Sequence, residues 1–187
     1  MDRLRQALLR RLAATAAALL AAGCGRDAPH TVYVQSDWSP EEEGKIVEAI
    51  DDWNALAERR LADPRPLLVY GGRASVPEFA REAMDDGRSV IYRIGRPTPE
   101  IDALERETGP FGGYGCYGDM LLVPYHLCQD CDDYLRYLRI TTTHELGHFL
   151  GFPHYQNRPG IMNPGDWDSD RLTAADEDMF CQFYDCR

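Results

Sequence analysis

Lysine, histidine and long apolar runs are scarce in this sequence, and each shortage narrows the range of functions. Lys45 is the only lysine among 20 basic residues, while 31 residues are acidic, so the formal net charge is −11. This balance disfavours nucleic acid or an anionic lipid surface as the main partner, and a solvated acidic surface accounts for it. The 187 residues, 44% of them hydrophobic, suffice for one compact domain but not for two.

An apolar run near the N-terminus, residues 12–22, follows a basic start with four arginines. As a helix this run would be only about 16 Å long, roughly half the thickness of a bilayer core. A basic start followed by a short apolar run is typical of a secretory signal peptide rather than of a membrane-spanning helix. We therefore expect a signal peptide over residues 1–23.

The end of this segment, LAAGC at residues 20–24, resembles the bacterial lipoprotein box. The resemblance implies that Cys24 is acylated, so that a lipid anchor alone holds the protein at a membrane of the cell envelope. Ordinary cleavage after residues 21–23, which would release a secreted protein, is the alternative. In either case we expect a short tether over 24–30 and a folded domain over 31–187.

Export would place the cysteines where disulfides persist. If Cys24 carries lipid, five cysteines remain and at least one has no partner within the chain; otherwise three bridges can form. Cys128 and Cys131 have the spacing of half a zinc site or of a redox pair, but Cys181 and Cys186 match the other half poorly. A disulfide between the 128–131 region and the C-terminal segment is the simpler expectation. The sixth cysteine is Cys116.

The apolar pattern predicts strands over 31–35, 66–72, 89–94 and 119–123, and long helices over 39–61, 132–151 and 172–186. Ser39 with Glu42, and Thr173 with Asp176, form the capping boxes that begin two of these helices. A short helix over 75–87 and one helical turn over 99–107 are also expected. The glycine-rich segment GGYGCYG, residues 112–118, is either an edge strand or a plain loop. We predict an α+β fold with a twisted mixed sheet of four to five strands and three helices.

Three of the five histidines lie within the stretch HELGHFLGFPH, residues 144–154. His144 and His148 are four residues apart, so on a helix both imidazoles face the same side. Glycine at position 151 ends the helix, because it accepts a left-handed backbone conformation, and the turn can return His154 to the same side. Three neutral imidazoles with one open coordination position are typical of catalytic zinc.

Glu145 is rotated by about 100° from His144, so it reaches a water on the metal rather than the metal itself. Zinc lowers the pKa of such a water to about 7, and Glu145 would act as the general base that takes its proton. This is the chemistry of peptide-bond hydrolysis. A non-catalytic zinc-containing binding module of the envelope, or a zinc hydrolase of a non-protein amide, are the alternatives.

The extended pattern HExxHxxGxxH, with Met162 following in RPGIMNPG, resembles the metzincin clan of zinc metalloproteases and within it the matrixins. RLTAADEDMFCQFY, residues 171–184, is similar to the matrixin C-terminal helix. The resemblance implies a metzincin-like fold, a zinc endopeptidase acting on proteins or peptides, and a monomer. It implies zinc ligation by His144, His148 and His154, general-base catalysis by Glu145, a Met-turn at Met162, and substrate binding along residues 112–118.

A weak resemblance to a calcium-binding loop is formed by four acidic residues, Asp166, Asp168, Asp170 and Glu177. Such a loop needs glycine at the position that Arg171 occupies. A solvated acidic turn that caps the following helix explains them better. Calcium is therefore a secondary expectation beside zinc.

Overall fold

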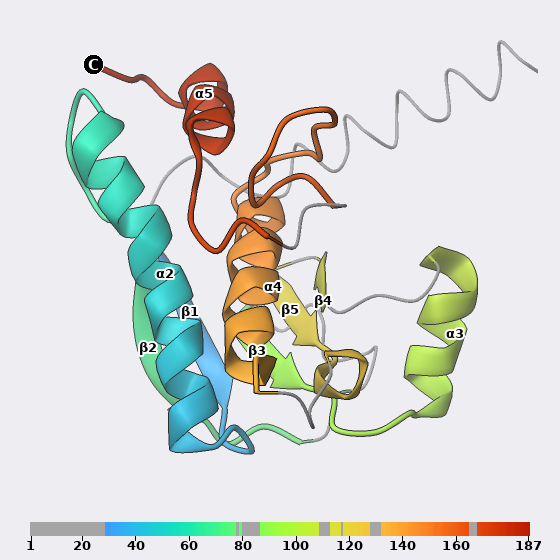
Figure 1. Cartoon of the computed structure of the whole chain (residues 1–187). Helices are drawn as coiled ribbons and strands as arrows, with labels where there is room; N and C mark the ends of the chain where they lie inside the picture. The colour runs from blue at the N-terminus through green and yellow to red at the C-terminus, as the bar shows by residue number, and fades with distance from the viewer. Residues whose placement is uncertain are drawn as a thin grey trace, which may run out of the picture.

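The computed structural model describes residues 29–77, 79, 87–108, 113–116, 118–127, 132–164 and 168–187. Two long helices, α2 (Pro40–Arg60) and α4 (Tyr134–Phe149), lie side by side across one face of a sheet (Figure 1). Helix α3 (Pro99–Thr108) covers part of the opposite face, and α5 (Ala174–Phe183) lies beyond one end of α4. None of the helices in these segments combines the length and apolar character needed to cross a bilayer.

The sheet has five strands in the order β2-β1-β3-β5-β4, of which the first four are parallel and β4 is antiparallel to β5. Parallel neighbours need crossover connections, and α2 and α3 each provide one. The strands are β1 (His30–Gln35), β2 (Leu68–Ala74), β3 (Ser89–Arg93), β4 (Gly113–Cys116) and β5 (Asp119–Leu122). The expected mixed sheet and its strands are confirmed to within two residues at most ends, and GGYGCYG contributes an edge strand.

The described helices number four rather than three, and the parallel strands with their helical crossovers make the fold α/β rather than α+β. The additional helix is α3, where only one turn was expected. Its start is fixed by Thr98, whose hydroxyl accepts from the Ile101 amide at 3.3 Å, with Pro99 in the first turn. Ile101 and Leu104 are buried against the sheet. The short helix expected over 75–87 lies largely outside the described residues.

A hydrophobic core fills the space between the sheet and the pair α2 and α4. It takes alternate residues from the strands, such as Val32 and Val34 of β1, and includes Trp53 of α2 and Leu146 of α4. The intervening residues of β3 and β5 point to the other face, where a smaller cluster packs under α3. Both sides of the central strands are therefore covered, which fixes the sheet against which α4 is held.

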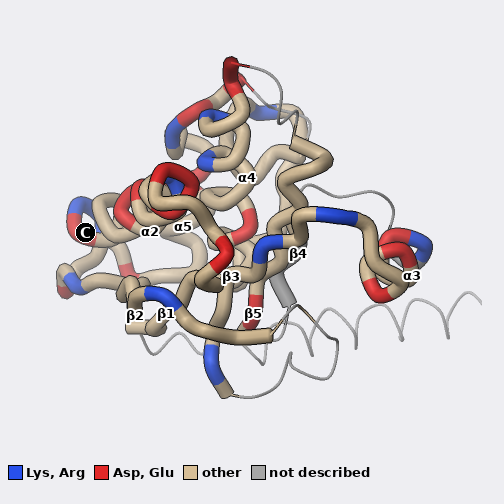
Figure 2. The backbone as a smooth tube through the Cα atoms, turned by 90° about the horizontal axis from the view of Figure 1, so that it is seen from below, with Lys and Arg blue, Asp and Glu red and all other residues tan. Residues whose placement is uncertain are grey.

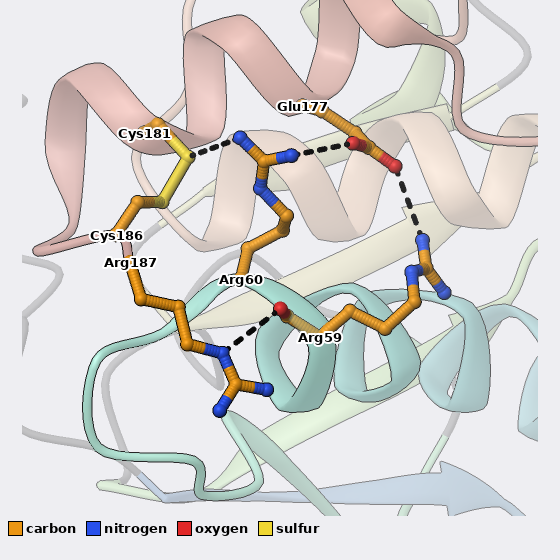
Figure 3. Close-up of a disulfide and its surroundings, with 6 residues drawn as sticks. All are labelled: Arg59, Arg60, Glu177, Cys181, Cys186 and Arg187. Atoms are coloured by element: carbon orange, nitrogen blue, oxygen red, sulfur yellow. Dashed lines mark hydrogen bonds and ion pairs between the residues drawn. A yellow bond between two sulfur atoms is a disulfide. The ribbon is translucent and has the colours of Figure 1, made fainter.

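The C-terminal segment is fastened to the end of α2 (Figure 3). A disulfide joins Cys181 to Cys186, and Cys186 forms an isolated β-bridge with Leu61. The Arg187 amide donates to the Arg60 carbonyl at 2.8 Å, and its guanidinium donates to carbonyls of the preceding turn. The expected bridge from the 128–131 region to this segment is therefore wrong, because the two C-terminal cysteines pair with each other. Cys128 and Cys131 lie outside the described residues.

Acidic and basic residues are interspersed along the backbone (Figure 2). One of these charges, Glu42, is buried where α2, α4 and β3 meet. Its carboxylate accepts from the Ser39 amide at 2.9 Å, the Tyr134 hydroxyl at 2.6 Å and the Arg93 guanidinium at 3.0 Å. Burial alone would raise the pKa of Glu42, but the hydrogen bonds from Tyr134, Ser39 and Arg93 outweigh it and lower the pKa below its ordinary value.

We expect Glu42→Gln to lower the free energy of unfolding at pH 7 by about 1–3 kcal/mol, because a charged acceptor of three donors is lost. The folded-state pKa lies below the unfolded one, so the carboxylate stabilises the fold above the unfolded pKa. That stabilisation disappears as the pH falls through the folded pKa. Urea unfolding at a series of pH values should show the deficit shrinking below about pH 4. Exposed Glu41→Gln, on the same turn, is the control; an equal deficit at every pH would contradict the assignment.

Candidate metal centre

Helix α4 carries the first two histidines and is held on the side that faces α2. Leu138 and Leu146 are fully buried there. The Trp53 indole of α2 donates to the Thr143 carbonyl at 2.8 Å, immediately before His144. Leu146 and Leu150 anchor the helix in the core. The turn of α4 that presents His144 is therefore fixed by both packing and a buried hydrogen bond.

The chain reverses just after α4 and returns the third histidine. Gly151 adopts φ of 91°, a conformation that favours glycine, and the Phe152 amide bonds back to the Gly147 carbonyl at 2.9 Å. Phe152 then stacks on Trp53 with ring centroids 5.1 Å apart. A buried aromatic at this turn fixes the direction in which the chain leaves the helix, and this brings His154 beside His144 and His148.

The three imidazoles converge. His154 Nε2 lies 2.9 Å from both His144 Nε2 and His148 Nε2. The other ring nitrogens of the helical pair are held by backbone carbonyls: His144 Nδ1 lies 2.6 Å from the Ile161 oxygen, and His148 Nδ1 lies 2.8 Å from the Phe152 oxygen. A carbonyl only accepts, so the proton of each ring is on Nδ1 and the lone pair on Nε2 points to the centre of the triad.

This donor set fits a metal ion. Burial lowers the pKa of His144 to about 4, and burial likewise lowers the pKa of His148 and His154, so all three rings are neutral at pH 7. Two or more unprotonated nitrogens at such short separations repel one another unless a cation lies between them. Tetrahedral zinc, with bonds of about 2.0–2.1 Å to nitrogen, places its ligand nitrogens roughly 3.3 Å apart, which is close to the separations here.

No protein-family model matches this chain, and no curated protein has a significantly similar sequence. The assignment of a candidate metal site therefore depends on the geometry alone. Within the described residues, the triad is the one group of three or more His, Cys, Asp or Glu side chains arranged to hold a metal ion. Its ligand atoms all lie within 4.8 Å of one another. The arrangement is consistent with a zincin-like site, in which a helix and the following turn supply three histidines.

Met162 packs against α4 at Gly147, between the two helical histidines. It is fully buried, and a Cβ added at Gly147 would overlap its sulfur, so the glycine between the two helical histidines is what admits the methionine. The residue before it, Ile161, supplies the carbonyl that orients His144. The sequence places Met162 near the site, and the structure brings it directly beneath α4.

Glu145 lies on the side of α4 that faces the edge strand β4, and only 7% of it is exposed. A Cβ at Gly113 of β4 would stand 2.5 Å from Glu145 Cγ and 3.0 Å from Cδ. The glutamate is therefore beside the triad but not part of it, as the helical rotation predicts. The family resemblance implies that residues 112–118 lie near the site, but the contact of Gly113 with Glu145 is not encoded in the spacing of either segment.

Asp176 is the functional residue that sequence reasoning missed in its main role. The capping box with Thr173 is present as expected, but the carboxylate is fully buried and does more. It accepts from the amides of Ile161 at 3.1 Å and Met162 at 3.0 Å, and from the Tyr155 hydroxyl at 2.8 Å. A capping box predicts only where a helix begins. It does not predict that this aspartate also binds the loop at residues 161–162, next to the histidines.

The residues expected to bind calcium or to carry lipid are the last of the sequence predictions to be compared with the structure. Glu177 pairs with Arg59 and Arg60 of α2 at 3.2 and 3.5 Å, so its carboxylate is engaged away from the proposed calcium loop. Asp166 lies outside the described residues, as do Cys24 and the whole of the expected signal peptide. Calcium binding and lipidation stay predictions.

We expect Asp176→Asn to weaken zinc binding and to lower the free energy of unfolding by about 2–4 kcal/mol, because an amide replaces one of the two oxygens that accept buried donors. The loop at 161–162 then no longer fixes the His144 ring, and loss of such a supporting contact lowers metal affinity by about 10–100-fold. Competition with a chromophoric chelator measures this. Asp178→Asn, in the same helix but exposed and paired with Arg158, is the matched control. Equal zinc affinity in both variants would contradict the assigned role.

Proposed function

We propose that this protein is a zinc-dependent endopeptidase of the metzincin type, with His144, His148 and His154 as zinc ligands and Glu145 as general base. One observation carries the proposal. Three neutral imidazoles with inward lone pairs converge beside a glutamate that faces an edge strand. A purely structural zinc site needs four protein ligands and has no use for that glutamate.

When bound, zinc supplies a Lewis acid and a water of lowered pKa. The chain's own residues do the rest. His144 and His148 are held in one tautomer and orientation by the carbonyls of Ile161 and Phe152. The Glu145 carboxylate accepts the proton of the attacking water and afterwards delivers it to the amine of the departing peptide. Burial of Glu145 beside β4 keeps the proton transfer away from bulk solvent.

The edge strand β4 supports a peptide as the substrate. Its pairing with β5 uses one side only, and it is the last strand in the sheet order. An extended peptide can add to such an edge through main-chain hydrogen bonds, independently of its side chains. Because Gly113 of β4 contacts Glu145, a peptide laid along this edge would bring its scissile bond close to the base.

The placement of Met162 beneath α4, and of α5 behind the loop that carries it, agrees with the matrixin-like pattern of the sequence. We extend the proposal to a matrixin-like catalytic domain over 31–187, acting as a monomer. Side-chain preference is left open, because residues 165–167 and the segments flanking β4 lie outside the described residues.

The decisive comparison is between the wild type and Glu145→Ala, each loaded with zinc and given an unfolded protein as substrate. We expect cleavage by the wild type and a loss of about 10²–10⁴-fold in kcat for the variant, the size of a general-base contribution. Both proteins should bind one zinc, since Glu145 is not a ligand. Zinc content by atomic absorption is the control.

Two results would contradict the proposal. Equal cleavage by both proteins would remove Glu145 as the base. Absence of cleavage by the zinc-loaded wild type would favour the non-catalytic envelope module, or a hydrolase of a non-protein amide, and a panel of cell-wall amides then separates those two.

We also propose that the protein is exported and held at the cell envelope by lipid on Cys24, so that its substrates are neighbouring envelope proteins. The support is the basic, then apolar N-terminal segment ending in LAAGC. Expressed in a bacterium, Cys24→Ser should move the protein from the membrane fraction to the soluble fraction, while Cys116→Ser should not. A wild type found in the soluble fraction alone would favour ordinary secretion.

A further inference from the structure

Three consecutive threonines of α4 differ in a way that the proposed function does not explain. The hydroxyls of Thr142 and Thr143 donate to carbonyls four residues earlier, at 2.7 and 2.9 Å. This is the usual way in which a helix satisfies a threonine. Thr141 is only 2% exposed, and its hydroxyl has no hydrogen-bond partner in the described part of the chain. A buried hydroxyl without a hydrogen bond destabilises the folded protein, so its presence at this position needs a functional explanation.

Thr141 lies one helical turn before Glu145, on the same side of α4. Both side chains meet the same point of the edge strand. A Cβ at Gly113 would stand 3.0 Å from Thr141 Cγ2 and 3.0 Å from Glu145 Cδ. The methyl group of the threonine and the carboxyl group of the glutamate are therefore at most twice that distance apart. Of the three consecutive threonines, only Thr141 supplies one of the three heavy atoms nearest to that Cβ.

The methyl and hydroxyl groups of threonine are both attached to Cβ, and rotation by one rotamer step moves the hydroxyl into the position that the methyl held. Such a step would place the Thr141 hydroxyl where its methyl now faces Gly113, beside the Glu145 carboxyl group. The rotation breaks no hydrogen bond of the hydroxyl, because it has none to lose. Thr142 and Thr143 would each have to give up a bond to the helix backbone.

We propose that Thr141 is a positioning residue for Glu145: its hydroxyl donates to the Glu145 carboxylate when a peptide lies along β4, and so fixes the oxygen that accepts the proton. The inference rests on the proposed function. A hydrogen bond formed only in the working state contributes to kcat rather than to substrate binding. This accounts for a donor that is buried beside the base and yet unpaired in the protein alone.

Thr141→Val tests the proposal, because valine has nearly the same shape and lacks the donor. With a peptide substrate and zinc-loaded protein, we expect kcat to fall about tenfold, equivalent to about 1.4 kcal/mol, with KM changed by less than about twofold. Thr141→Ser keeps the hydroxyl and should recover most of kcat. The melting temperature of Thr141→Val should equal or exceed that of the wild type, because no hydrogen bond of the folded protein is removed.

Thr142→Val is the matched control: the same substitution, one residue further on, removing a hydroxyl that is bonded to the helix. It should lower the melting temperature and leave kcat unchanged. Zinc content is measured for every protein. Unchanged kcat in Thr141→Val would overturn the proposal, and so would an equal loss in Thr141→Ser, which would indicate packing. If the wild type cleaves nothing, both the proposed function and this inference are contradicted. If the wild type is active and Thr141→Val is equally active, only this inference is contradicted.

Discussion

The buried carboxylate of Asp176 is the constraint on which the arrangement of the three histidines depends. It joins α5 to the loop that passes beneath α4, through the amides of Ile161 and Met162. The same loop supplies the carbonyl that holds His144, and Tyr155, which follows His154, donates to the same aspartate. The Asp176 carboxylate therefore fixes both the residue after His154 and the loop whose carbonyl holds His144. A carboxyl group so completely buried is tolerable because both of its oxygens accept hydrogen bonds from this loop and from Thr173.

Helix α4 contacts both α2 and the edge strand β4, through different residues. The side toward α2 is apolar and fixed by Trp53, whose indole bonds to the backbone next to His144 and whose ring stacks on Phe152. The side toward β4 carries Thr141 and Glu145, against a strand whose glycine leaves them room. The hydroxyl of Thr141 is thus left unpaired on the part of the helix that meets β4.

Most strands, the three long helices and the triad could be predicted from the sequence because they rest on local patterns, whereas the fold class could not. Helical spacing placed His144 and His148 together, glycine at 151 marked the turn, and the capping boxes at Ser39 and Thr173 marked two helix starts. What could not be predicted depends on contacts between distant segments. The role of Asp176, the closeness of Gly113 to Glu145 and the pairing of Cys181 with Cys186 all follow from tertiary packing. Helix α3 was underestimated because prolines flank a short apolar pattern.

X-ray absorption at the zinc edge of the purified protein tests the central claim most directly, since it reports the number and kind of atoms around the metal. We expect one zinc with three nitrogen neighbours at about 2.0–2.1 Å, one oxygen ligand and no sulfur. Loss of one nitrogen neighbour in His154→Ala would assign the third ligand to the loop. Sulfur in the first coordination sphere, or a protein that takes up no zinc, would contradict a catalytic zinc held by His144, His148 and His154.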